Sequence, residues 1–90
     1  MDAALQITSQ NTKDEALATA CRGAAKAGAS DAVLKGVPKI ASQNLRDQVA
    51  ADCALSLRDS GKGTVSTDVA KLIVSNNTRD EVLKKLASGP

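Results

Sequence analysis

Three pairs of adjacent basic and acidic residues carry the clearest chemical potential in this sequence. The pairs are evenly spaced along the chain, and they are Lys13-Asp14, Arg46-Asp47 and Arg79-Asp80. They could form a charged ladder along one edge of the molecule. An acid in the first turn of a helix also interacts favourably with the free N–H groups and the positive end of the helix dipole. We therefore expect each acid to serve the start of its own helix, and each base to form ion pairs between repeats.

Cys21 and Cys53 are the residues that a redox or nucleophilic reaction would use. A reactive thiolate needs an electropositive neighbour such as a protonated histidine, and the sequence contains no histidine. Both cysteines fall at helical spacing among Ala, Val and Leu, where a free thiol behaves as a small apolar side chain. We predict that both are buried, and that the chain has no catalytic residue, metal site, cofactor or disulfide framework.

The segment Gly61-Lys62-Gly63-Thr64 has some of the residues of a phosphate-binding loop. The Walker pattern requires Gly-x4-Gly-Lys-[Ser/Thr] after a strand. Here Lys62 is followed by Gly63, no glycine lies five positions before Gly61, and the preceding residues are helical in pattern. The segment is therefore predicted to be a loop between repeats.

Three lysines are the candidate partner-binding residues. Lys35 and Lys39 are four positions apart, so on a helix they share one side, and Lys71 occupies a comparable region of the next repeat. They could bind a protein or peptide along one surface, or they could simply form a solvated face. Nucleic acid is not expected as the partner, because basic residues are scattered and the aromatic residues that stack on bases are absent.

A repeated motif organises the elements that must position these residues. It reads Ile-x-Ser-[Gln/Asn]-Asn-x-[Lys/Arg]-Asp and begins at Ile7, Ile40 and Ile73, so that the two intervals between copies are equal. A fixed period of this size is typical of stacked supersecondary units. We therefore treat residues 1–90 as a single helical-repeat domain with copies aligned at 7, 40 and 73.

Apolar spacing predicts a first and a second helix in each repeat. The second helices are expected over residues 12–27, 45–58 and 78–87, each capped by the Asn before it (Asn11, Asn44 and Asn77). The first helices are expected over residues 2–8, from Ser30 or Asp31 through the apolar positions up to Ala41, and from a start between Thr64 and Thr67. Pro38 should kink the middle one near Gly36.

Composition restricts the class of protein. The chain has 90 residues, 42% hydrophobic residues, a formal net charge of +2 and no aromatic residue, so its core must be built from Ala, Val, Leu and Ile. The charge balance argues against a polyanionic partner. No apolar run is long enough to span a membrane, and the acidic start lacks the apolar core of a signal peptide. A cytoplasmic location without membrane association is the default expectation.

Helix pairs at this period resemble an α-solenoid. The repeat length is similar to that of tetratricopeptide-like repeats, although their Trp and Tyr positions are missing, and the ankyrin motif Thr-Pro-Leu-His is also absent. The middle repeat resembles HEAT-type repeats, with Val37-Pro38 in its first helix and Arg46-Asp47-Gln48-Val49-Ala50-Ala51 opening its second. Copies one and three lack the proline. The resemblance implies a protein-binding scaffold.

The expected fold is therefore all-α, a short right-handed stack of antiparallel helix hairpins with 33-residue repeats and about five to six helices. The expected function is a non-enzymatic module that binds a protein or peptide along the surface of its first helices, through Lys35, Lys39 and Lys71. The alternative is a small structural or regulatory protein that forms a homo-oligomer, such as a homodimer, through an uncovered apolar end of the stack. Its pathway and its partner do not follow from the sequence.

Overall fold

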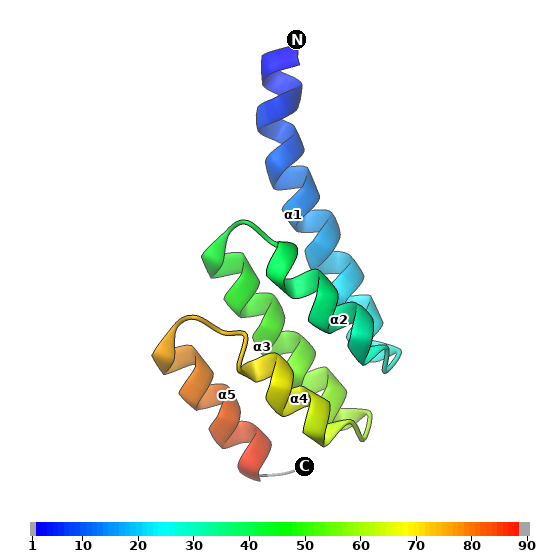
Figure 1. Cartoon of the computed structure of the whole chain (residues 1–90), viewed down its shortest axis with the longest axis vertical. Helices are drawn as coiled ribbons and strands as arrows, with labels where there is room; N and C mark the ends of the chain where they lie inside the picture. The colour runs from blue at the N-terminus through cyan, green and yellow to red at the C-terminus, as the bar shows by residue number, and fades with distance from the viewer. Residues whose placement is uncertain (1, 89–90) are drawn as a thin grey trace.

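The fold is entirely helical in the part of the chain that the structure describes. The computed structural model describes the backbone of residues 2–88 and the side chains of residues 12–88. This part contains no strand (Figure 1). Its helices are α1 (Asp2–Lys26), α2 (Ser30–Gly36), the 3₁₀ helix η1 (Val37–Lys39), α3 (Gln43–Asp59), α4 (Gly63–Ala70) and α5 (Asn76–Ser88). The expectation of an all-α fold is confirmed.

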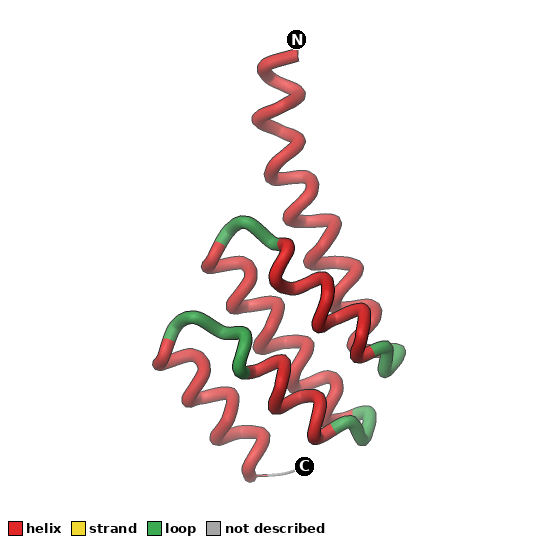
Figure 2. Tube along the Cα trace, viewed as in Figure 1, coloured by secondary structure: helices red, strands yellow, loops and turns green. Residues whose placement is uncertain are grey.

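Helix α3 is the central element of the molecule. It packs against α1, α4 and α5, and it lies between α1 and α5 in Figure 1. Helix α2 and η1 pack on α1, while α4 packs on both α3 and α5. The chain turns back at each connection, so α1, α3 and α5 form one layer and α2, η1 and α4 form a second layer (Figure 2).

The core contains only aliphatic side chains and the two cysteines, as the composition requires. Its largest fully buried apolar members are Ile40, Leu57 and Ile73, and alanines fill much of the space between the helices. One approach is especially close, because a Cβ added to Gly36 of α2 would lie 2.6 Å from the Sγ atom of Cys21 in α1. Small residues thus let these two helices pack tightly without aromatic rings.

Helix α1 is one continuous helix where we expected two. The prediction of a short helix over residues 2–8, followed by a second one capped by Asn11, is wrong, because α1 runs unbroken from Asp2 to Lys26. No Gly or Pro interrupts residues 2–22. Helix is then the conformation that pairs their backbone groups.

The caps of the later helices also differ from the prediction. The N-cap of α3 is Ser42, whose side chain accepts a hydrogen bond from the amide of Leu45. Asn44 and Asn77 lie inside the first turns of α3 and α5 rather than at their caps. At the start of α5, the carbonyl of Ser75 accepts the first helical hydrogen bond, from Arg79. Both helices therefore start earlier than predicted. A serine, which is a favoured N-cap residue, stands at each start.

Pro38 ends a helix instead of kinking it. Helix α2 stops at Gly36, and Val37–Lys39 continue as the tighter η1 with Pro38 near its start. Ile40 then adopts an extended conformation. Proline lacks the N–H that an α-helix needs in its interior but is tolerated in a first turn. The predicted position of the disturbance, near Gly36, is confirmed, although its form is different.

Two glycines end the long helices in the same way. Gly28 and Gly61 have φ values of 77° and 84°, in the left-handed region that favours glycine. The amide that follows each glycine donates back into the helix, from Ala29 to the Ala24 carbonyl and from Lys62 to the Leu57 carbonyl, at 2.8 Å in both cases. This is the Schellman arrangement of a helix C-terminus. The predicted role of Gly28 as a helix stop is confirmed.

Candidate functional site

Asp14 of α1 binds the backbone of the turn that precedes α3. Its carboxylate accepts hydrogen bonds from the amides of Ala41 at 3.0 Å and Ser42 at 3.2 Å. The residue is only 5% exposed. Ala41 and Ser42 lie between η1 and α3, where their amides have no helical acceptor, and a carboxylate with two oxygens can satisfy both of them.

Asp47 of α3 makes the same kind of contact further along the chain, with the next copy of the sequence motif. Its carboxylate accepts hydrogen bonds from the amides of Val74 at 3.0 Å and Ser75 at 3.1 Å, and it is 6% exposed. Relative to the Asp14 contact, the acceptor and both donors are each displaced by the interval between copies of the sequence motif. Hydrogen bonds to a charged group contribute about 1.5–3 kcal/mol each. The same carboxylate-to-turn contact therefore fastens α1 to the start of α3, and α3 to the start of α5.

This geometry corrects the sequence interpretation of the acidic residues. Asp14 and Asp47 do not serve the start of their own helices, because both carboxylates bind the amides of a later turn. The adjacent bases do not form the expected ion pairs between repeats within the described residues. Arg79 instead donates to Asn76 Oδ1, at 2.6 Å in the same helix.

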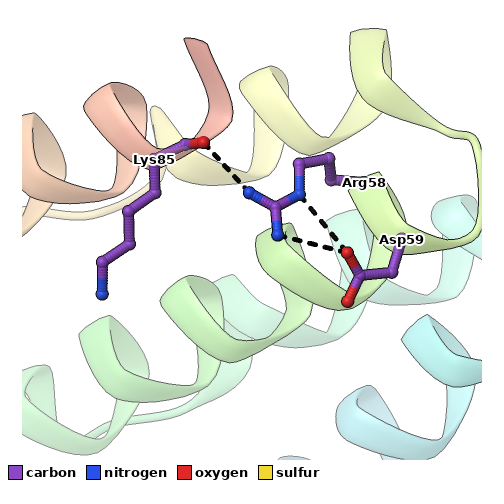
Figure 3. A network of polar contacts seen from close by, with 3 residues as sticks. All are labelled: Arg58, Asp59 and Lys85. Atoms are coloured by element: carbon purple, nitrogen blue, oxygen red, sulfur yellow. Dashed lines mark hydrogen bonds and ion pairs between the residues drawn. The ribbon is translucent and has the colours of Figure 1, made fainter. Parts of the chain in front are cut away.

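Other arginines link the helices of the first layer. Arg22 of α1 forms an ion pair with Asp52 of α3 at 2.9 Å, although both side chains are about half exposed. Arg58 of α3 donates to the Lys85 carbonyl of α5 at 3.0 Å, and Asp59 holds its guanidinium group from the other side (Figure 3). The Lys85 carbonyl belongs to the last turn of α5, where carbonyl groups have no partner within the helix. Arg58 thus caps α5 from the neighbouring helix.

Asp80 of α5 is the third residue in the series of Asp14 and Asp47, and its environment is different. It is exposed, and no described residue donates a hydrogen bond to it. It lines an open groove along α5 that has apolar and charged walls. The other lining residues are Asn77, Glu81, Leu83, Lys84 and Ala87.

The groove on α5 occupies the positions that are interfaces on α1 and α3. One repeat before Asp80, Leu83, Lys84 and Ala87, the equivalent residues of α3 are Asp47, Ala50, Ala51 and Ala54. Asp47, Ala50 and Ala54 are buried and Ala51 is half-buried. On α5 the matching Leu83 is half-buried, and the other three are exposed. The face of α5 that matches a buried face of α3 is therefore uncovered.

The three lysines of the predicted binding surface lie in the second layer. Lys35 is in the last turn of α2, Lys39 ends η1 and Lys71 directly follows α4. All three are exposed, and none forms an ion pair with a described residue. The structure brings them to the same layer, and their role as partner-binding residues stays a prediction.

The cysteines are unsuited to nucleophilic chemistry. Cys21 is 3% exposed and Cys53 is fully buried, which confirms the predicted burial. Both are free thiols. Burial raises the pKa of Cys21. Burial first, and then the neighbouring Cys21, raise the pKa of Cys53 to about 12, so that it stays a thiol at neutral pH.

Other sites considered from the sequence find no counterpart in the described residues. Lys62 and the residues around it form an exposed connection between α3 and α4, as predicted for a loop. No group of three or more potential metal ligands comes together among the side chains that the structure describes. Within the same part of the chain, no helix combines the length and apolarity needed to cross a bilayer.

Sequence reasoning missed the backbone donors of the site. The amides of Ala41, Ser42, Val74 and Ser75 bind the carboxylates, and backbone groups leave no signature of their own in a sequence. A signal did exist, because the Ile-x-Ser motif follows an Asp at the same sequence separation in both cases. Comparisons of the chain with protein-family models, with curated proteins and with solved structures found no match.

Proposed function

We propose that the chain is a short right-handed stack of antiparallel helix hairpins with a 33-residue unit. Support comes from features that recur with this offset. These are the carboxylate contacts of Asp14 and Asp47 and the glycine caps at Gly28 and Gly61. In this proposal α2 with η1 and α3 form one unit, α4 and α5 form the next, and α1 is the second helix of the first unit.

We further propose that this stack is a non-enzymatic module for protein–protein interaction. The observation that carries the proposal is the uncovered face of α5 around Asp80. In an open-ended stack each unit covers the face of the preceding one, and the last face stays available. Its ligand would be a polypeptide that offers two successive free amides before a helix, because that is what Asp14 and Asp47 bind.

A chain extended by one unit tests whether this face accepts a helix hairpin. Residue 88 corresponds to residue 55, so residues 1–88 followed by a second copy of residues 56–88 keep the repeat in register. We expect this extended chain to resist urea better than the parent chain, because the added hairpin buries the groove. The Asp80→Asn change should remove a large part of the gain, about 2–4 kcal/mol, because two amides lose a charged acceptor. An extended chain that is no more stable than the parent would contradict the proposal.

The lysines of the second layer provide a further surface for the same function. Lys35, Lys39 and Lys71 are exposed and have no acidic partner among the described residues, so an acidic peptide is the ligand that fits them. We expect a poly-glutamate peptide to shift the NMR signals of α2 and η1, and we expect Lys→Gln changes at the three positions to abolish the shifts. Changing Lys84 and Lys85 of α5 instead is the matched control, which should leave the binding intact. Equal loss in both variants would indicate binding by net charge alone.

Homo-oligomer formation is a second candidate function, because α1 also has an uncovered face. Ala16, Ala20 and Gly23 are exposed along α1. One repeat later, they correspond to Val49, Cys53 and Ser56 of α3. Cys53 lies near Cys21 of α1, so the position equivalent to Ala20 faces the preceding helix. Mass in solution at rising protein concentration tests this function.

A further inference from the structure

We propose that the partner at Asp80 is the N-terminal end of a second copy of this chain, so that copies associate head to tail. This inference rests on the proposed function, because it identifies the polypeptide that the α5 face binds. The head is residues 7–11 with the exposed face of α1, and the tail is the α5 groove around Asp80.

The donors for Asp80 are present in the repeated motif itself. Asp14 binds the amides of Ala41 and Ser42, and Asp47 binds those of Val74 and Ser75. Each donor pair stands in the motif that begins one position earlier, at Ile40 or Ile73. The motif occurs a third time at Ile7, where the equivalent amides are those of Thr8 and Ser9. Unlike the other two pairs, these amides lie within a helix, α1.

An acceptor without a described donor and a copy of the donor sequence thus belong to α5 and α1, the two helices that pack on either side of α3. Asp80 has a carboxylate without a described donor, and Thr8-Ser9 has the donor sequence. A second copy placed by continuing the repeat brings the two together. The contact is heterologous, since different surfaces of each copy meet, and such contacts lead to rings or open filaments rather than closed dimers.

The helix faces of the two ends also match an interface that the molecule already contains. Ala50 and Ala54 of α3 are buried and lie three and seven positions after Asp47, on the same side of the helix, and the equivalent residues of the tail are Leu83 and Ala87. Val49 and Cys53 of α3 are also buried, with Cys53 near Cys21 of α1, and the equivalents on the head are Ala16 and Ala20. Docking would place the large Leu83 of the tail against small head residues. The proposed contact continues the packing of α1 on α3 and of α3 on α5.

Docking requires residues 7–11 to leave the helical conformation that they have in α1. Two of the residues that would open, Thr8 and Ser9, favour caps and turns over helix interiors, and β-branched Ile7 also has a modest helix propensity. This part of α1 extends beyond the neighbouring helices (Figure 1). Opening it disrupts helical hydrogen bonds, and the carboxylate of Asp80 replaces two of the lost acceptors.

Sedimentation velocity on the full chain tests head-to-tail association. The mass of the parent chain should rise with concentration. Asp80→Asn damages the tail and Ala20→Glu damages the head, and each should weaken self-association at least about tenfold, the change expected from losing charge-assisted hydrogen bonds. Asp68→Asn, an equal charge change at an exposed position of α4, is the control and should behave like the parent. Thermal unfolding of each variant verifies that it is folded.

Mixing the two damaged variants is the decisive step. The Asp80→Asn chain keeps an intact head and the Ala20→Glu chain keeps an intact tail, so an equimolar mixture should form a one-to-one pair with the affinity of the parent contact. A parent chain that stays monomeric, an Asp80→Asn chain that associates like the parent, or a mixture that does not associate would each overturn the inference.

If the chain extended by one unit still shows an Asp80-dependent gain in stability, only the assignment of a second copy fails. If that gain is also missing, the proposed function fails with it.

Discussion

At the scale of single residues, the molecule depends on two buried carboxylates whose partners are backbone amides. Asp14 and Asp47 are both nearly inaccessible to water, and each satisfies two amides that no helix can satisfy. The third member of the series, Asp80, has the same side chain in an exposed setting. Asp80 therefore serves as an internal control for the free energy that the contact of Asp14 or Asp47 contributes.

Asp47→Asn is expected to lower the free energy of unfolding by about 2–4 kcal/mol, because the amides of Val74 and Ser75 lose a charged acceptor and one of them faces an N–H₂ group. The same substitution at Asp80 should change the stability of the monomer by no more than about 0.5 kcal/mol, as is usual for an exposed position. Urea unfolding of both variants measures the difference. Equal effects at the two positions would show that the hydrogen bonds to the turn are not stabilising.

The buried thiol of Cys53 makes stability depend on alkaline pH. Its pKa is raised to about 12 in the folded chain, chiefly by burial, whereas an unfolded thiol titrates at about 8.5. Between these values the unfolded chain releases a proton that the folded chain keeps, so stability falls as pH rises through this window. Urea unfolding at neutral pH and at pH ~10 should show a smaller loss for Cys53→Ala than for the parent chain. Identical losses would mean that other groups cause the alkaline destabilisation.

At the scale of elements, serines and glycines set the ends of helices, and one glycine permits a close contact between two helices. Ser42 caps α3, Gly28 and Gly61 end α1 and α3, and Gly36 allows α2 to lie against α1. These residues act through backbone geometry rather than through apolar burial. Substitutions at the helix ends are therefore expected to have position-specific effects.

Ser42→Ala should destabilise the chain by about 0.5–2 kcal/mol, since it removes the side-chain cap of α3. The value should lie toward the lower end, because the bond from the Leu45 amide is long, at 3.4 Å. Asn44→Ala is the matched comparison, since Asn44 lies inside the first turn of α3 and caps nothing. Thermal melting of the two variants decides between them, and a larger loss for Asn44→Ala would restore the cap that the sequence first indicated.

Gly36→Ala should destabilise the chain by about 1–3 kcal/mol through overpacking, because the new methyl group would overlap the Cys21 sulfur. Gly63→Ala is the control, since a Cβ at that position meets nothing within 4 Å. Removing the sulfur in the double variant Gly36→Ala, Cys21→Ala should recover part of the loss, so that the two single effects are not additive. Strict additivity in urea unfolding would place the strain elsewhere.

At the scale of the whole molecule, stability is expected to be highest in the middle. Helix α3 packs against α1, α4 and α5, whereas α1 and α5 each have one uncovered side. In a stack of units that contact only their neighbours, the end units open more easily than the central one.

Native-state hydrogen exchange tests this order of stability. We expect the amides of residues 47–57 in α3 to exchange most slowly, and those of α5 and of the first turns of α1 to exchange faster. The amides of Val74 and Ser75 should be protected more than their place in a connection suggests, because Asp47 holds them. Uniform protection from α1 to α5 would indicate a single cooperative unit rather than a stack.

Much of this architecture can be predicted from short stretches of the sequence. The helical class, the burial of Cys21 and Cys53, the disturbance near Gly36 and the helix stop at Gly28 all follow from spacing and from backbone preferences that act over a few positions. Tertiary structure decided the rest. Residues 7–11 and 40–44 share a motif, yet the first lies within α1, and the second contains the extended turn before α3, where Asp14 holds two of its amides. The conformation of the motif depends on a carboxylate from a distant helix, and so do the positions of the caps and the partners of the acids. Such long-range contacts form only in the packed chain. The helical and the turn conformation of the motif are close in free energy, so two hydrogen bonds to a charged group are enough to determine which of the two is adopted.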